Sequence, residues 1–277
     1  MRWQLIILKM ANLNPGTRGA IRGRLAAAIL LSAAVGMVFA DESRNPVFAG
    51  RAGAEFHRAQ TQFQSHTNDS AAAWQFARAC YDFADFATNN ADRAALAELG
   101  IAAGHQLLAR EPKSAPGHYY LGMNFGKLAD AEAPSMAAYK LVHEVEREFK
   151  SAAELDEHFD FAGPARNLGE LYFQAPGWPL SVGGKHKARE WLERAVQLAP
   201  DYPENHLNLI EARLKWNDRA GAQRELKTLD TLWPDAQKVL AGEAWERSWN
   251  DWSTRRDAAR IKLDESGAPS KPPKNSR

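Results

Sequence analysis

Histidine, cysteine and acidic side chains are the residues through which this sequence could do chemistry. It has eight histidines and a single cysteine, Cys80. Neither His-Glu-x-x-His nor Cys-x-x-Cys, the spacings that gather ligands around one metal ion, occurs in it. The serine-nucleophile pattern Gly-x-Ser-x-Gly is also missing. The sequence therefore predicts no enzyme activity, no metal site and no cofactor, and Cys80 is expected to be a buried small apolar residue.

Residues 182–187, VGGKHK, end like a nucleotide-binding P-loop, in which a glycine-rich turn and a lysine hold phosphates. The pattern fails at two positions. The residue five places before Gly184 is Pro179 instead of glycine, and the residue after Lys185 is His186 instead of serine or threonine. A helix, not a strand, is expected before this segment. We predict that it binds no nucleotide.

Two glutamates, Glu144 and Glu148, lie one helical turn apart, a spacing that could serve acid–base chemistry. Because Arg147 and Lys150 stand beside them, a solvated charged face is the expected structure.

The elements that must position these residues are helices. The chain has 277 residues, of which 45% are hydrophobic, enough for one or two domains with a sizeable core. Alanine-rich segments dominate, and apolar residues do not alternate with polar ones as they do in strands. The sequence predicts an all-α protein.

The first 40 residues have the pattern of a secretory signal peptide. Arginines lead into an apolar stretch from Leu25 to Ala40, and Val38 and Ala40 are the small residues expected before a cleavage site. We expect cleavage after Ala40 and a periplasmic or secreted protein; an uncleaved anchor, the only expected membrane contact, is the alternative. Without residues 1–40 the chain has 30 basic and 34 acidic residues, a net charge of −4, which does not favour nucleic-acid binding.

Repeated helix pairs are visible in the second half of the sequence. Pro200 and Pro234 are 34 positions apart, the period of the tetratricopeptide repeat (TPR), in which small and large residues at fixed positions let two antiparallel helices pack closely. We expect Pro234 to close the last repeat. The first helices take His118, Leu168 and His206 at pattern positions, and the second helices take Ala188 and Ala222; a weaker copy begins at Trp74. Both histidines are expected to pack between helices.

The sequence resembles TPR proteins over residues 70–235, and this resemblance implies a solenoid of helical hairpins. After Pro234 a single long helix is expected, with Trp245, Trp249 and Trp252 on one face to cover the last repeat. The predicted organisation is a signal peptide at 1–40, a lead-in segment at 41–68, the repeat domain at 69–263 and a disordered tail at 264–277.

Seven additional residues interrupt the repeat pattern between Gly169 and Ala188, where Pro176, Trp178 and Pro179 precede two glycines. Prolines restrict the backbone, and a tryptophan is costly to expose. We expect an ordered loop that is pinned by Trp178, either in a groove between repeats or beside a ligand.

Residues 163–214, which include this loop, resemble bacterial TPR proteins related to the T-component of TRAP transporters. The resemblance implies an exported helical-repeat protein that pairs with a periplasmic solute-binding protein or binds other partners. Such components often carry a lipid on a cysteine at the cleavage site. This sequence has no cysteine there.

Two functions remain open. In the first, a protein-interaction scaffold presents first-helix side chains to a peptide or protein partner: His118, Tyr119, Asn124, Asn167, Glu170, Asn205, Asn208 and Glu211. In the second, a T-component-like accessory protein binds a small ligand or a solute-binding protein beside the loop, with Tyr172, Trp178, Leu180 and Tyr202 around an apolar pocket.

Overall fold

The computed structural model describes residues 45–265. The predicted signal peptide and residues 266–277 of the predicted tail lie outside them. The described chain is helical, and its one β-bridge, Gly177 with Gly183, is isolated; the all-α prediction is confirmed. The helices are α3 (Pro46–Ser65), α4 (Ser70–Ala84), α5 (Asn90–Arg110), α6 (Ala115–Glu132), α7 (Met136–Leu155), α8 (Phe159–Gln174), α9 (Lys185–Leu198), α10 (Pro203–Lys215), α11 (Arg219–Val239), the 3₁₀ helix η2 (Glu243–Trp245) and α12 (Glu246–Glu265).

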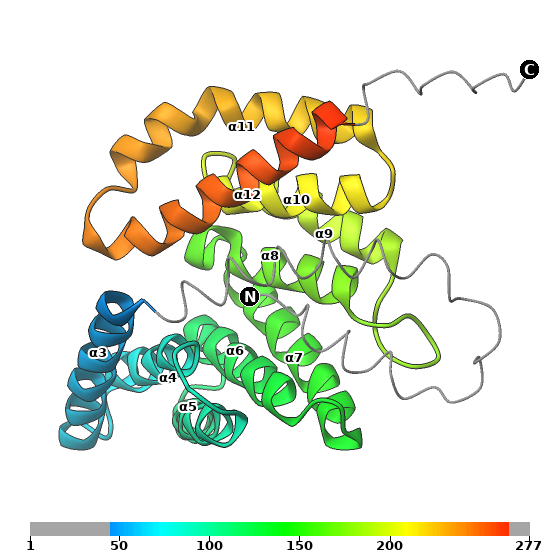
Figure 1. Ribbon diagram of the computed structural model, residues 1–277. Coiled ribbons are helices and arrows are strands. Elements are labelled where there is room, and N and C mark those ends of the chain that lie inside the picture. The colour runs from blue at the N-terminus through cyan, green and yellow to red at the C-terminus, as the bar shows by residue number, and fades with distance from the viewer. Residues whose placement is uncertain (1–44, 266–277) are drawn as a thin grey trace, which may run out of the picture. The chain divides into compact units, whose positions relative to one another are not determined.

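The chain divides into two compact units between Trp191 and Leu192, and each unit is described by itself. In the first unit α4 pairs with α5 and α6 pairs with α7, so consecutive helices form hairpins (Figure 1). Polar caps begin these helices: Asp69 accepts a hydrogen bond from the amide of Ala71, and Ser135 accepts one from the amide of Ala138. The local sequence thereby sets where each helix starts.

The hairpins pack at the small residues that the repeat pattern predicts. A Cβ atom at Gly122 would lie 2.9 Å from the ring of Phe149, so only glycine lets α6 approach α7 this closely. Ala188 is fully buried, as expected for a second-helix position.

First helices of successive hairpins also touch one another. Helix α4 contacts α6, and α6 contacts α8, so these three form a row that we call the inner row. An additional helix, α3, lies in the predicted lead-in segment and packs on α4, where Phe56 and Phe63 meet the ring of Phe76. The inner row positions the residues considered below.

The second unit is closed by α12. Trp252 is 1% exposed, and its ring lies 4.9 Å from Trp249 and 5.3 Å from Tyr202. The same core holds Leu207, Ile210, Leu226 and Leu229, and Ala222 is fully buried. The predicted capping helix is confirmed, because α12 covers apolar side chains of α10 and α11.

Two details of this end of the chain were predicted wrongly. Helix α11 continues through Pro234 to Val239, so this proline does not end the repeat. The expected single helix beyond it is broken at Leu240–Gly242, where Gly242 has φ +95°, and Trp245 lies in η2 instead of α12. Beyond the proline, Ala236 is buried and the indole nitrogen of Trp249 donates to the Leu240 carbonyl at 2.6 Å, so the end of α11 is held against α12.

Among residues 45–265, no helix combines the length and apolar character needed to cross a membrane.

Candidate binding surface

An aromatic cluster joins the three helices of the inner row. We call Trp74 of α4, Tyr119 and Tyr120 of α6, and Phe159 of α8 the inner aromatic cluster. The rings of Trp74 and Tyr120 are nearly parallel, with centroids 5.7 Å apart, and Phe159 stands perpendicular to both. Tyr119 completes the group at 5.3 Å from Phe159. Such geometries are the favourable ones for aromatic pairs, so they fix the ring positions.

A left-handed turn lies beside this cluster at the start of α8. Asp160, Phe161 and Ala162 have φ of 51°, 56° and 61°, so three consecutive residues other than glycine adopt the left-handed conformation. Each costs about 1–2 kcal/mol because its Cβ crowds the following carbonyl. A turn of this kind persists only where neighbouring groups hold it, and such turns are concentrated at functional sites.

Arg166, which is 4% exposed, is the group that holds the turn. One guanidinium nitrogen donates to the carbonyl oxygens of Asp160 and Phe161, at 3.2 and 3.0 Å, and another donates to the Asp160 carboxylate at 3.0 Å. Hydrogen bonds from a charged donor are each worth about 1.5–3 kcal/mol, so the three together match the cost of the turn.

The turn is also tied to α6. The hydroxyl of Tyr119 donates to the Asp160 carboxylate at 2.7 Å, and the Asn167 amide donates to the same hydroxyl at 3.0 Å. Burial raises the pKa of Tyr119 well above its usual value, so this hydroxyl keeps its proton. A Cβ atom at Gly163 would lie 2.7 Å from the hydroxyl oxygen, which leaves glycine as the residue that fits there.

The solvent side of this arrangement combines apolar and charged groups. Trp74 and Phe159 are half-buried, and Phe161 is 41% exposed. Arg78 lies one turn after Trp74 on α4, and its exposed side chain is 3.5 Å from Asp82. The inner row therefore exposes parts of Trp74 and Phe159, whose rings are held by aromatic contacts, and Arg78 follows Trp74 by one helical turn.

His118 and His206 form the same clamp in two hairpins. In each, one ring nitrogen meets a glutamate 2.6 Å away, Glu148 or Glu225. The other nitrogen meets the carbonyl oxygen of the proline six residues earlier, at 3.0 Å from His118 and 2.6 Å from His206. Both nitrogens are occupied, so neither histidine offers one for proton transfer to a substrate. The prediction of plain packing missed these polar contacts.

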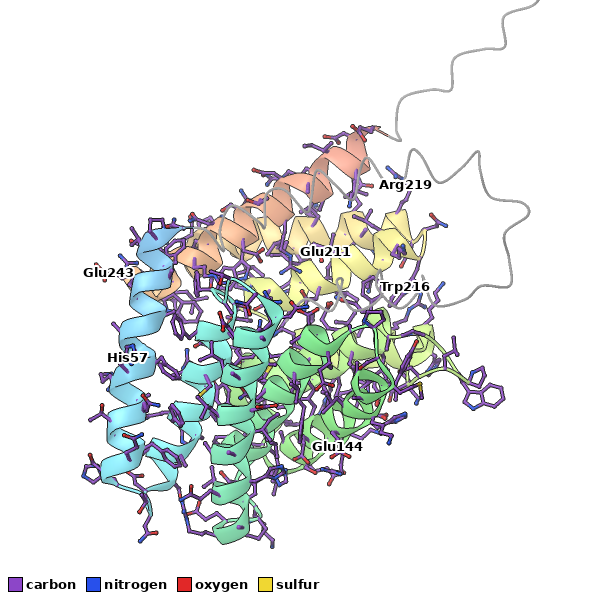
Figure 2. All side chains as sticks on the ribbon, turned by 60° about the horizontal axis from the view of Figure 1, so that its bottom comes forward. His57, Glu144, Glu211, Trp216, Arg219 and Glu243 are labelled. Atoms are coloured by element: carbon purple, nitrogen blue, oxygen red, sulfur yellow. The ribbon has the colours of Figure 1, made fainter. Side chains whose placement is uncertain are left out.

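The predicted solvated face around Glu148 is wrong. Glu148 is 4% exposed, and it accepts hydrogen bonds from His118 and Arg147. Burial alone would raise the pKa of this carboxyl, but these hydrogen bonds lower it. The same hydrogen bond has the opposite effect on His118, whose pKa it raises. Glu144 keeps a more exposed position and pairs with Arg147 (Figure 2).

The polar residues predicted to bind a partner already have contacts within the chain. Asn124 donates to the carbonyl of Ala77, and Glu170 is buried and accepts from Gln174 at 2.5 Å. In the second unit the Asn205 amide donates to the carbonyls of Ala195 and Ala199, both at 3.1 Å.

Helix α12 supplies the partner of Asn208 and Glu211. Arg255 donates to the Asn208 oxygen at 2.5 Å and to both carboxylate oxygens of Glu211 at 2.8 and 3.0 Å; Glu211 lies on α10 (Figure 2). The capping helix thus occupies this part of the α10 surface, and the predicted binding role of these residues stays a prediction.

The residues predicted around an apolar pocket have different surroundings. Tyr172 is buried, and its hydroxyl donates to Glu146 at 2.7 Å. Tyr202 belongs to the core beneath α12. Trp178 and Leu180 are 89% and 67% exposed. The expectation that Trp178 pins the loop is wrong, because hydrogen bonds of the backbone hold the loop instead.

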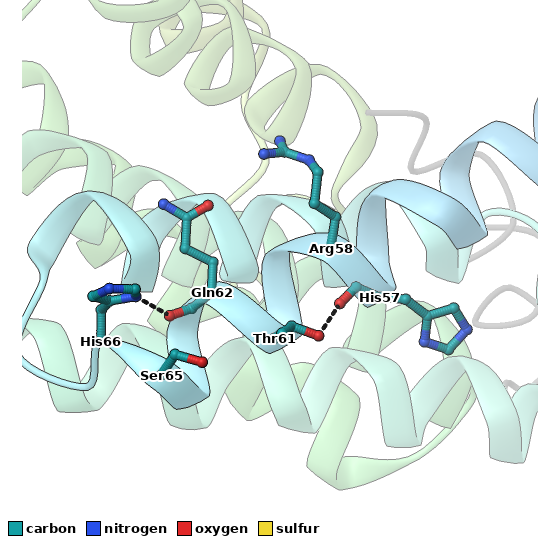
Figure 3. A pocket seen from close by; sticks show the side chains of 6 residues that line it. All are labelled: His57, Arg58, Thr61, Gln62, Ser65 and His66. Carbon is teal, nitrogen blue, oxygen red and sulfur yellow. Dashed lines mark hydrogen bonds between the residues drawn. The ribbon is translucent and has the colours of Figure 1, made fainter.

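A shallow hollow on α3 contains no converging polar groups. His57, Arg58, Thr61, Gln62, Ser65 and His66 line it (Figure 3). Thr61 and His66 contact backbone carbonyls of their own helix, at 2.9 and 3.3 Å. No cluster of three potential metal ligands occurs among residues 45–265.

Sequence reasoning missed Phe159, Asp160 and Arg166. The turn residues Asp160, Phe161 and Ala162 include no glycine, so the usual signal of a left-handed conformation is missing. Trp74 was recognised as a repeat residue, and that position was the available signal for the inner aromatic cluster.

Comparisons with known proteins support the fold. No protein-family profile matches the sequence, and no curated protein sequence matches it. Among solved structures, the chain is similar to TTC0263, a thermophilic TPR protein in Thermus thermophilus, with a TM-score of 0.55 and 17% identity over 76% of this chain and 92% of that chain. Yeast Tom70 has a TM-score of 0.30 and 12% identity over 80% of this chain and 61% of its own. The similarity to TTC0263 and the paired helices show that this protein has a TPR-like fold, as predicted.

Proposed function

We propose that this protein is a non-enzymatic scaffold that binds a segment of a partner protein on the inner row. The observation that supports it is the inner aromatic cluster beside Arg78. Trp74, Phe159 and Phe161 leave apolar surface open to solvent, and Arg78, whose side chain is exposed, lies one helical turn after Trp74 on α4. The partner segment should carry an apolar side chain next to a carboxylate.

The fixed geometry of this surface favours binding. Ordering a side chain on association costs about 0.5–1.5 kcal/mol, and that cost is small where the rings already stack on one another. Tryptophan, tyrosine and arginine are also the residues that contribute most to protein interfaces. A few such groups on a rigid row are enough to recognise a short segment.

The test is selection from a displayed library of random peptides, followed by fluorescence anisotropy with the selected peptides. We expect selected peptides to pair an apolar residue with an acidic one. Arg78→Glu should weaken binding at least tenfold, and Trp74→Ala should do the same while the circular dichroism spectrum is kept.

Lys238→Glu makes the same charge change at an exposed site in the second unit and is the matched control. Peptides that bind the Arg78→Glu, Trp74→Ala and wild-type proteins equally would refute a site on the inner row. Because Arg78 is exposed, its replacement separates lost binding from lost folding.

We infer that the protein is exported after cleavage behind Ala40, which rests on the pattern of residues 1–40. Sequencing the amino terminus of the protein from a periplasmic or culture fraction tests this. A first residue of Asp41 is expected; intact residues 1–40 on a membrane-bound protein would indicate the anchor instead.

A role as a T-component-like accessory of a TRAP transporter is the alternative. If this accessory protein bound a small ligand, Tyr172, Trp178 and Leu180 would have to surround one pocket. In the structure Tyr172 is buried, whereas Trp178 and Leu180 are exposed. Its partner would then be a periplasmic solute-binding protein. A gene position beside TRAP permease subunits is the observation that would favour it.

A further inference from the structure

The loop between α8 and α9 exposes its most apolar residues. Gly177, Trp178, Pro179 and Leu180, which we call the loop tip, are all exposed, whereas the next two residues, Ser181 and Val182, are buried. At 89% exposure, Trp178 has the largest exposed fraction of the exposed large hydrophobic side chains in the described chain. Trp178 and Leu180, 89% and 67% exposed, form a contiguous apolar end, and exposed apolar patches of this kind mark contact surfaces.

Backbone contacts hold the loop tip in place. The amide of Gly183 donates to the Pro176 carbonyl and the amide of Gly184 to the Tyr172 carbonyl, both at 2.9 Å. The amide of Leu180 donates to the Gly177 carbonyl at 3.1 Å and closes the tip itself. The two sides of the loop lie so close together that a Cβ atom at Gly183 would overlap the Ala175 carbonyl oxygen, 1.9 Å away. The hydrogen-bonded base of the loop therefore holds the apolar loop tip in its exposed position.

Positive charge follows the loop tip directly. Lys185, Lys187 and Arg189 lie within the first turns of α9, and residues 175–189 contain no carboxylate. Lys185 and Arg189 are one turn apart and share a helix face. The amino group of Lys187 lies 5.0 Å from the centre of the Tyr172 ring, on the side of α8.

The acidic groups Glu146 and Glu190 near this segment have contacts with other side chains. Glu146 accepts hydrogen bonds from Tyr172 and Lys150. Glu190 lies 3.9 Å from His186. The segment from the loop tip to Arg189 is thus basic, in a chain that would carry a net charge of −4 after cleavage behind Ala40.

Size and charge together favour a lipid surface over a protein. A stable protein interface needs about 800 Å² from each partner, more than two protruding side chains supply. A bilayer interface has no such requirement: tryptophan prefers the headgroup region, and each basic residue near anionic lipid adds attraction. The strength of peripheral binding to a bilayer increases with the buried apolar area and with the electrostatic attraction to anionic lipids.

We propose that the loop tip inserts into the interfacial region of an anionic bilayer. Trp178 and Leu180 enter the boundary between headgroups and acyl chains, while Lys185 and Arg189 lie at the level of the lipid phosphates. The association is peripheral and reversible. It is independent of peptide binding on the inner row.

The test places a fluorescent reporter in the loop tip of the full chain. Leu180→Cys is labelled with an environment-sensitive dye; the buried Cys80 can stay, and wild-type protein given the same dye shows whether it remains unlabelled. Met136→Cys, at an exposed apolar position outside the loop, is the matched control. Vesicles of phosphatidylcholine alone and of equal parts phosphatidylcholine and phosphatidylglycerol are the probes.

We expect blue-shifted, stronger emission from position 180 with the anionic vesicles, and little change from position 136. Added salt should weaken the response. Trp178→Ser, or Lys185→Gln with Arg189→Gln, should raise the vesicle concentration for half-maximal response at least tenfold. Equal responses at the two positions, or in both kinds of vesicle, would overturn the proposal.

A response that appears without vesicles and grows with protein concentration would also overturn it, because it would make the loop tip a contact between copies of the chain. The Trp178→Ser protein should keep the melting temperature of the wild type, since its side chain is exposed. A loss of binding in this variant is then not a loss of folding.

Discussion

The left-handed turn at the start of α8 makes an unusual prediction about glycine substitutions. Ala162 and Ala165 are almost equally buried, at 0% and 1% exposure, but Ala162 is left-handed and Ala165 is in the regular helix. Replacing either by glycine removes a buried methyl group, worth about 0.8 kcal/mol, and adds a penalty of roughly 1 kcal/mol for the more flexible backbone. At Ala162 alone, the change also removes a left-handed strain of about 1–2 kcal/mol.

We therefore expect Ala165→Gly to lower the free energy of unfolding by about 2 kcal/mol and Ala162→Gly to change it by less than about 1 kcal/mol. Urea denaturation followed by circular dichroism measures both, and the slope with urea should be the same for the two variants. Equal losses in the two proteins would refute the left-handed turn. So would a larger loss at Ala162.

Three further outcomes follow from the described contacts. Gly163→Ala should destabilise the protein by about 1–3 kcal/mol in thermal melting, because the new methyl group meets both the hydroxyl and the ring carbons of Tyr119, and an unchanged melting temperature would contradict this close approach. Because the pKa of His118 is raised in the folded protein, the stability that His118 contributes is complete below about pH 6.5 and is lost as the pH rises through the folded-state pKa. His118→Gln should therefore flatten the pH dependence of the unfolding free energy in that window. An unchanged pH profile would contradict the clamp with Glu148. Burial raises the pKa of Cys80 to about 12, so a thiol reagent at about pH 8 should react only on unfolding, and rapid reaction of the folded protein would show that Cys80 is accessible.

Helix pairing could be predicted from the sequence because it depends on repeated local signals. Small residues such as Gly122 and Ala188 fix where helices approach, and these recur at the repeat spacing. Pro234 shows the limit of such signals. A proline usually ends a helix, yet α11 continues past it, where Ala236 is buried and Trp249 of α12 donates to the Leu240 carbonyl.

The candidate binding surface could be predicted only in part. Position in the repeat pointed to the first helices, and Trp74 and Asn167 do lie in the inner row. The left-handed turn depends on Arg166, four to six residues further on, and on contacts with Tyr119 of another hairpin. No local pattern encodes such a combination.

The exposed Trp178 could not be predicted because burial preference describes an average residue. Tryptophan usually packs, but the closed hydrogen-bonded base of this loop leaves no space beneath its tip. The same rule succeeded for Trp252, which has the apolar sides of two helices to cover.

The return of α12 across α10 limits how this repeat array could grow. A further hairpin added after α11 would have to replace α12 and leave Asn208 and Glu211 without Arg255. Duplication of an earlier hairpin makes no such demand. Lengthened descendants of this architecture should therefore carry their extra repeats upstream of α10 and keep the arginine-bearing last helix unchanged.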